Sequence, residues 1–380
     1  MAHEIAMKRK PATKKKTALR KHVNRSGISL TSGETDSPLP HESVFREVLD
    51  MIETARDRAY QAVNTELIDL YWHVGEFISL KIAADGWGKN TVSDLSVFIR
   101  ARRPGISGFS ASNLWRMRQF YDTYAKQPKL AALLRELNWT QNLLILARAK
   151  RAEEREFYLR LCVREKWPSR ELKRQLASAL FERTILAPPK LAPLVRELHP
   201  AAVTLFKDTY LLEFLDLPEV HSEADLQHAL VANLKRFLIE LGRDFTFAGE
   251  QYLLQVGGRD FHLDLLFYHR ELQCLVAFDL KIDEFQPEFL GKMEFYLEAL
   301  DRDVRKPHER LSIGVLLCAT KDDEVVEYSL SRSLSPALIA EYQTALPDKQ
   351  LLQRKLHEFY QLAQPAPDAP KAKHRKPPKA

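Results

Sequence analysis

Two short apolar runs, residues 261–268 and 274–278, lie on either side of a charged turn and limit the possible folds more than any other part of the sequence. Runs of this length bounded by turn residues predict neighbouring strands of a β-hairpin. Asp264 lies within the first run, and Asp279 directly follows the second. Aspartate is depleted in strands, and two adjacent carboxylates repel each other unless a cation lies between them. The hairpin therefore predicts a site for a hard divalent cation with oxygen ligands, and Mg²⁺ is the usual one.

Lys281 lies two positions after Asp279, so both side chains project from one face of the strand while Leu280 points to the core. A lysine beside a bound metal ion can orient the attacking water or neutralise charge that develops on a phosphoryl group. Taken alone, the spacing favours a simpler interpretation, an Asp–Lys pair on a sheet edge that contributes little energy. Asp264, the apolar residues on both sides and the helix expected downstream reverse that preference.

Five local sequence phrases carry a resemblance to a known family. They are residues 71–75 (YWHVG), 108–114 (GFSASNL), 237–242 (FLIELG), 264–269 (DLLFYH) and 291–297 (GKMEFYL). With these phrases, residues 45–358 resemble the bacterial YhcG family of PD-(D/E)XK (PDDEXK) nucleases. The last three phrases are specific in combination.

The resemblance implies a metal-dependent hydrolase, an endonuclease that cleaves phosphodiester bonds in DNA. By the same resemblance, Asp264 and Asp279 would bind Mg²⁺ or Mn²⁺, and the backbone carbonyl of Leu280 would be a further ligand. Lys281 would be the catalytic lysine that assists water attack. RNA is the alternative substrate, although the sequence shows no motif for stacking RNA bases.

One position departs from the family's pattern. Related nucleases have an acidic residue on the helix before the first strand, and the resemblance places that position near Ala232. Glu223 and Glu240 flank this helix about two turns away. The missing acid would weaken binding of a second metal ion or, at the extreme, abolish activity. An alternative function is therefore a nucleic-acid-binding or complex-forming protein that keeps the nuclease fold with weak or no catalysis.

Four further residues are candidates for auxiliary roles. Glu250 could replace the missing acid as a ligand or base, and a solvated glutamate on a strand explains it equally well. Gln251 could reach the phosphate, although an outward polar side chain is the simpler account. Lys292 and Tyr296 are four positions apart and share a helix face. In recombination-type relatives a Gln-x-x-x-Tyr pair lies here beside the active site, and this chain has Lys in place of Gln.

At 380 residues the chain is long enough for two domains with full cores. We expect an N-terminal all-α domain and a C-terminal restriction-endonuclease-like α/β domain with a mixed sheet. The expected parts are a disordered basic tail (1–43), a helical DNA-binding domain (44–186), a proline-interrupted linker (187–221), the nuclease domain (222–363) and a second disordered basic tail (364–380).

In the helical domain, residues 45–84 predict one long helix or a helix pair, and residues 91–102 predict a second helix. Ser110 is a plausible N-cap for a third helix through Tyr124, with Tyr121 in its buried stripe. Two helices around a glycine-containing break suit a helix-turn-helix-like unit, and a helical bundle with a basic solvated face is as good an interpretation. The candidate nucleic-acid contacts are Arg100, Arg102, Arg103, Asn113, Arg116 and Gln119.

In the second domain, hydrophobic spacing predicts one amphipathic helix that begins at Ser222 and is ended by Gly242. The other expected elements are strands at 245–256 and 311–320 and helices at 287–300, 338–342 and 351–362. The resulting order of helix, three strands, helix and strand agrees with the core of the nuclease family.

The remaining composition bounds the compartment and the partners. Cys162, Cys274 and Cys318 are far apart in apolar runs, which predicts buried thiols in a reducing compartment rather than disulfides or a zinc site. No apolar run reaches membrane-spanning length, and no apolar segment follows the N-terminal charges. We therefore expect a cytoplasmic protein with no membrane partner. The sequence leaves open whether it forms homo-oligomers.

The N-terminal tail has nine basic residues and one acid in its first 25 positions. Such a run is typical of a solvated tail and of an electrostatic arm that contacts phosphates, and the two interpretations are not exclusive. We favour the arm, which would make DNA the partner and allow association with the nucleoid.

Overall fold

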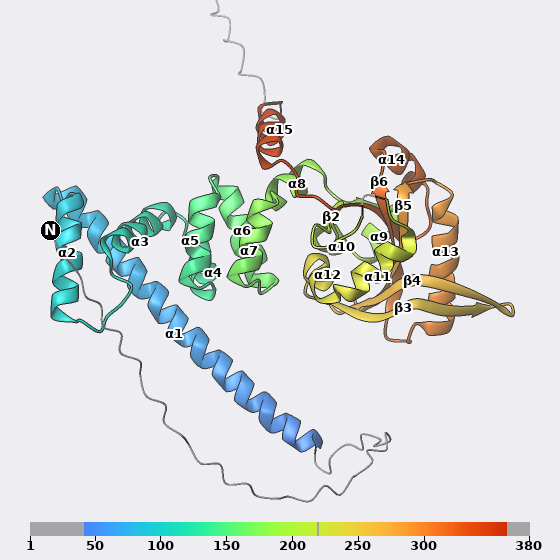
Figure 1. The fold of residues 1–380 in the computed structure, drawn as a ribbon, viewed down its shortest axis with the longest axis horizontal. Helices are drawn as coiled ribbons and strands as arrows, with labels where there is room; N and C mark the ends of the chain where they lie inside the picture. Colours follow the sequence, from blue (N-terminus) through green and yellow to red (C-terminus); the bar gives the residue numbers. More distant parts are fainter. Residues whose placement is uncertain (1–41, 219, 363–380) are drawn as a thin grey trace, which may run out of the picture. The chain divides into compact units, whose positions relative to one another are not determined.

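The computed structural model describes residues 42–218 and 220–362 (Figure 1). The two predicted basic tails lie outside these residues, apart from positions 42 and 43, which belong to the first helix. The chain separates into two compact units, residues 1–57 and 58–380. The described part of the first unit is the beginning of helix α1 (Glu42–Asp85). The second unit contains the rest of α1 and the other described helices and strands.

The N-terminal part of the second unit is helical. Its elements after α1 are α2 (Lys89–Arg102), α3 (Ala111–Tyr124), the 3-10 turn η1 (Pro128–Leu130), α4 (Ala131–Glu136), α5 (Trp139–Arg148), α6 (Ala152–Arg164), α7 (Ser169–Ala177) and α8 (Leu180–Leu186). Residues 45–84 therefore belong to one helix, not to a pair. Within residues 42–218 and 220–362 no helix is both long and apolar enough to cross a membrane.

Helix α3 begins where its sequence predicts and packs closely on α1. The Ser110 side chain accepts a hydrogen bond from the backbone N–H of Asn113, which is the expected N-cap geometry. Phe120, rather than the predicted Tyr121, continues the buried stripe of α3, because the hydroxyl of Tyr121 donates to Glu76 instead. A side chain at Gly75 would overlap backbone atoms of α3, so this glycine permits the close approach of the two helices.

The C-terminal part is built on a mixed sheet with the strand order β1-β7-β6-β5-β4-β3. The strands are β1 (Lys190–Leu191), β2 (Thr209–Leu211), β3 (Phe245–Val256), β4 (Arg259–His269), β5 (Cys274–Glu284), β6 (Arg310–Thr320) and β7 (Ala337–Gln343). Strands β3, β4 and β5 are antiparallel neighbours, whereas β5, β6 and β7 run parallel. A helical region followed by a mixed α/β sheet confirms the predicted fold class.

Helices cover both faces of this sheet (Figure 1). They are α9 (Pro193–Leu198), α10 (Ala202–Leu205), α11 (Glu223–Ala232), α12 (Leu234–Leu241), α13 (Phe289–Ala299) with a π turn η2 (Leu300–Val304), and α14 (Asp323–Ser331). The last helix, α15 (Lys349–Leu362), instead packs on α8 of the helical region. The ring of Phe237 on α12 packs on Phe278 of β5. A Cβ at Gly314, the register partner of Ala277, would meet Met293 on α13. Because consecutive strand residues point to opposite faces, α12 and α13 lie on opposite sides of the sheet.

Two expected elements differ in the structure. Residues 338–342, predicted as a helix, form strand β7 between β6 and β1. A short apolar run does not distinguish a buried strand from a helix by periodicity alone, and only the neighbouring strands decide it. The helix predicted from Ser222 to Gly242 is two helices, α11 and α12, because Asn233 leaves the helical conformation between them.

The segment predicted as a linker contributes to the sheet. Within residues 187–221, β1 pairs with β7 in antiparallel orientation and β2 pairs with β7 in parallel orientation. None of the five prolines of this segment lies within β1 or β2, so they do not remove a backbone donor from the pairing. The three cysteines are free and buried, as predicted.

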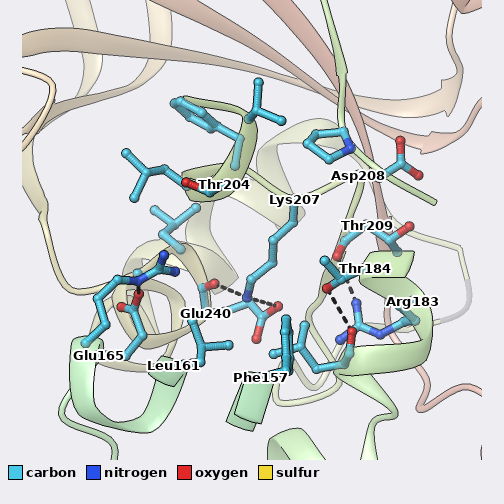
Figure 2. Close-up of a pocket in the computed structure, with 18 of the residues that line it drawn as sticks. Phe157, Leu161, Glu165, Arg183, Thr184, Thr204, Lys207, Asp208, Thr209 and Glu240 are labelled. Atoms are coloured by element: carbon cyan, nitrogen blue, oxygen red, sulfur yellow. Dashed lines mark hydrogen bonds and ion pairs between the residues drawn. The ribbon is translucent and has the colours of Figure 1, made fainter. Parts of the chain in front are cut away.

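A buried group of charges joins the helical region to the sheet region. Glu240 on α12 is completely buried and forms ion pairs with Lys207 and with Arg174 of α7, each at 2.8 Å. Its Oε1 also accepts a hydrogen bond from the backbone N–H of Leu211. Lys207 and Glu240 line a cavity of about 350 Å³. Figure 2 shows both residues in its wall, with Phe157 among the other lining residues. The Arg174–Glu240 ion pair therefore connects α7 and α12.

Candidate active site

Strands β4 and β5 bring the two predicted aspartates together. Leu265 pairs with Phe278, so Asp264 and Asp279 occupy the next positions along the two strands. The Asp264 Oδ2 atom accepts a hydrogen bond of 2.8 Å from the backbone N–H of Leu280. This bond fixes one carboxylate against the backbone of the strand that carries the other.

Asp279 is completely buried, and each of its carboxylate oxygens lies beside a lysine ammonium group. Oδ1 accepts a hydrogen bond of 2.9 Å from Lys292 Nζ, and Oδ2 lies 3.0 Å from Lys281 Nζ. The contact with Lys281 lacks hydrogen-bond geometry, so Oδ2 has no hydrogen-bond partner among the described residues. Burial alone would lower the pKa of Lys292, but the Asp279 carboxylate outweighs burial and raises that pKa.

Lys281 is held at the end of the site by groups from three elements. Its ammonium donates to the backbone carbonyl of Leu280 at 2.9 Å and lies 3.4 Å from Glu223 Oε1 at the start of α11. It also lies 5.5 Å from the centre of the Phe289 ring on α13. The register of β5 on β6 shifts directly after Lys281, between residues 281 and 284. Such irregularities in strand pairing are frequent next to active sites, where they redirect side chains.

Two glutamines support Asp264. Gln227 on α11 donates to the backbone carbonyl of Asp264 at 3.2 Å and accepts from Gln251 Nε2 at 2.7 Å. The same Gln251 nitrogen lies 3.4 Å from Asp264 Oδ1. Gln251 has a backbone φ of +43°, a left-handed conformation that costs a non-glycine residue about 1–2 kcal/mol. Burial raises the pKa of Asp264, the Leu280 N–H opposes this effect, and the Asp279 charge adds to it.

Glu223 was named from the sequence only as an acid that flanks the helix before the first strand, and its contact with Lys281 was not predicted. The expected acidic position near Ala232 lies at the far end of α11, whereas Glu223 in the first turn reaches Lys281. The Ser222 side chain caps α11 and accepts a hydrogen bond from Asp225 N–H, which sets where the helix begins. An available signal was the pair Glu223 and Gln227, four positions apart directly after a helix cap and therefore on one helix face.

The other auxiliary candidates occupy different positions. Tyr296 on α13 donates its hydroxyl hydrogen bond to the backbone carbonyl of His262 at 2.8 Å. Its ring lies under Lys292, with the ammonium 5.3 Å from the ring centre. Glu250 pairs with Leu265 through the backbone of β3, and its exposed side chain has no hydrogen bond or ion pair with another described residue.

The six candidate nucleic-acid contacts differ in their exposure and in their hydrogen bonds. Five of them are exposed at the end of α2 or on α3: Arg100, Arg102, Arg103, Arg116 and Gln119. The sixth, Asn113, has a structural role, because its amide donates to Gly108 and accepts from Trp139 Nε1 at 3.0 Å. A role of the five exposed residues in DNA binding stays a prediction.

The donor atoms at the hairpin fit a hard divalent cation. They are oxygens of two carboxylates and the Leu280 carbonyl, and Mg²⁺ commonly binds one or two carboxylates while keeping several waters. The observation that favours a metal is the buried Asp279 Oδ2 without a hydrogen-bond partner. In the described part of the chain, no cluster of three or more His, Cys, Asp or Glu side chains is arranged around one metal position. The site therefore fits a metal ion with few protein ligands.

Comparison with known sequences gives the class of protein. Residues 203–357 match a family model described as the YhcG PDDEXK nuclease domain, and residues 47–183 match the DUF1016 N-terminal domain. In an alignment of 366 positions, which covers 86% of this chain and 96% of the other protein, the sequence is 30% identical to the candidate nuclease YhcG of Escherichia coli (strain K12). With the mixed sheet and the aspartate hairpin, these matches define a nuclease of the PDDEXK type, a class that generally uses divalent metal ions. The chain belongs to the YhcG family of these nucleases.

Three solved structures are also similar to 35% of this chain and to about half of their own chains. One is a repair endonuclease from Pyrococcus abyssi, at 12% identity and a TM-score of 0.23 over 50% of that chain. The others are EndoMS without ligand and EndoMS with double-stranded DNA, at 14% identity, TM-scores of 0.22 and 0.23, and 49% of each chain. These TM-scores are too low to support an argument, so the family assignment rests on the sequence matches.

Proposed function

We propose that the chain is a metal-dependent endonuclease that cleaves DNA. In this proposal Asp264 and Asp279 bind Mg²⁺, the Leu280 carbonyl is a further ligand, and Lys281 assists the attack of water. Mn²⁺ has similar ligand preferences and could replace Mg²⁺. The observation that carries the proposal is the pair of carboxylates on adjacent strands with Lys281 beside them, in a chain of the nuclease family.

When bound, the metal ion would supply Lewis-acid activation of water and neutralise negative charge on the phosphate. The protein groups supply orientation. The Leu280 carbonyl and Glu223 hold the ammonium of Lys281 beside Asp279, where it can donate to a phosphoryl oxygen or orient the attacking water. Gln227 and Gln251 keep Asp264 in place.

The DNA backbone would contact basic residues outside the hairpin. The exposed arginines of α2 and α3 are suited to phosphates, which account for most non-specific affinity. Contacts to phosphates position a protein on DNA but carry no sequence information. The nuclease region would act on the backbone, so any sequence preference would come from base contacts made by the helical region.

The test is cleavage of linear, supercoiled, branched and single-stranded DNA, and of RNA, with Mg²⁺ or Mn²⁺. Lys281→Ala removes one preorganised donor and should lower the cleavage rate by about 10²- to 10³-fold. Circular dichroism and a DNA-binding assay should show that the variant keeps its fold and its affinity for DNA. If Lys281→Ala cleaves at the wild-type rate, the assignment of the site is wrong.

The alternative, a nucleic-acid-binding protein with weak or no catalysis, rested on the absence of an acid near Ala232. Glu223 is an acid on this helix that lies beside Lys281, and it supports the endonuclease over that alternative. The same experiment separates the two functions. DNA binding without cleavage of any substrate by the wild-type chain would favour the alternative.

A further inference from the structure

We propose that Lys292 couples metal binding to DNA binding. Its ammonium group pairs with Asp279 in the free protein and moves to a phosphate group when DNA binds. The inference rests on the proposed function and goes beyond it, because it predicts an order of events and assigns a role to a residue on α13. Lys292 would act as a positioning residue and not as a catalytic one. Its ammonium lies 2.9 Å from Asp279 Oδ1, one of the oxygens proposed to bind the metal.

The charges of the site favour this coupling. With every carboxylate ionised, three negative and two positive side chains give a net charge of −1: Glu223, Asp264, Asp279, Lys281 and Lys292. A divalent cation alone would change this to +1, and a phosphodiester group would then bring it to zero. Charge imbalance is costly near a fully buried carboxylate, because the surroundings screen it poorly. The site is thus balanced with metal and DNA together, and unbalanced with metal alone.

Of the two lysines, Lys292 is the one free to move. Its side chain is 47% exposed, whereas that of Lys281 is 10% exposed and also held by Glu223 and the Leu280 carbonyl. The ring of Tyr296 lies beside the Lys292 ammonium, and the Tyr296 hydroxyl is anchored on β4. Lys292 can therefore leave Asp279 for a phosphate in solvent while its stem stays on α13.

Linkage gives the expected consequences. If phosphate removes Lys292 from Asp279, DNA must tighten metal binding, and the metal must tighten DNA binding by the same factor. Coupling of this kind is commonly about 5- to 150-fold. Lys292→Gln removes the competing charge, so the site with metal alone becomes neutral. That variant should bind metal tightly without DNA and should lose most of the coupling.

The experiment measures Mn²⁺ binding to the full chain from the electron paramagnetic resonance signal of free Mn²⁺, with and without a duplex oligonucleotide shown to be intact on a gel. For the wild type, saturating DNA should lower the Mn²⁺ dissociation constant about tenfold or more. Lys292→Gln should bind Mn²⁺ about tenfold more tightly than the wild type without DNA, and DNA should add less than about twofold. Lys292→Arg keeps the charge and should behave as the wild type does.

Two controls make the outcomes distinguishable. Lys235→Gln removes an exposed lysine of α12 and should match the wild type in both measurements. Asp279→Asn should abolish the high-affinity Mn²⁺ site. Two results would overturn the coupling while leaving an Asp279-dependent Mn²⁺ site in place. One is equal Mn²⁺ affinity of Lys292→Gln and the wild type without DNA, and the other is a wild-type Mn²⁺ affinity that DNA does not change. Absence of any Asp279-dependent Mn²⁺ site would instead overturn the proposed metal-dependent function, and the coupling with it.

Discussion

Replacing Glu240 with glutamine removes one negative charge from the junction between α7 and α12 while keeping the size of the side chain. In the wild type this carboxylate is fully buried and contacts Lys207 and Arg174. Burial alone would raise the pKa of Glu240, but the two cations outweigh it and lower the pKa from 4.5 to about 2. The folded state therefore stabilises the ionised form of Glu240.

The size of the effect follows from this pKa. The difference between 4.5 and about 2 corresponds to about 3 kcal/mol of stability at neutral pH. Removal of one partner from a buried ion pair typically costs about 3–5 kcal/mol, which agrees. Because the folded pKa lies below the unfolded one, this stabilisation is complete above about pH 4.5 and is lost as the pH falls toward about 2.

The assay is urea unfolding of the wild type and Glu240→Gln between pH 7 and pH 2.5, followed by circular dichroism. The difference in free energy of unfolding should be about 3 kcal/mol at pH 7 and should shrink below pH 4.5. Glu294→Gln on the exposed face of α13 is the matched control and should change stability by less than about 0.5 kcal/mol. If Glu240→Gln is as stable as the wild type at pH 7, or if the difference in free energy of unfolding does not change with pH, the ionised Glu240 does not stabilise the fold.

Three other substitutions test the packing and the site. Gly75→Ala should destabilise the chain by about 1–3 kcal/mol in urea unfolding, because its Cβ overlaps the backbone of Met117. Gly291→Ala meets no atom within 4 Å and should instead stabilise α13 by about 0.5–1 kcal/mol, so equal effects of the two would contradict the packing argument. Glu223→Gln should lower DNA cleavage about 10- to 100-fold with unchanged unfolding, since it removes a charge that holds Lys281. Full cleavage by that variant would leave Glu223 without a role.

The antiparallel hairpin could be predicted from the sequence because the residues that indicate it are close together in the chain. The apolar runs, the charged turn and the aspartates all lie within 261–279, and the strand predicted at 245–256 has those bounds in the structure. The caps at Ser110 and Ser222 were predictable for the same reason, since each depends on a hydrogen bond between residues three apart. The fold class followed from these elements and from the family resemblance.

The unpredicted features depend on residues far apart in the sequence. Strand β7 was mistaken for a helix because its partners β6 and β1 are not encoded in its own short apolar run. Asn113 was expected to face DNA, and only the packing of α3 on α5 brings Trp139 to its side chain.

The sequence was sufficient to predict most local elements, the aspartate hairpin with Lys281 and the family. The acid that lies beside Lys281 and the cation that lies beside Asp279 depend on the tertiary structure. Glu223 is 58 positions from Lys281, and Lys292 is 13 positions from Asp279 on another element. Spacing along one chain predicts shared faces within a helix or strand, but contacts between elements depend on how the side chains of both pack together.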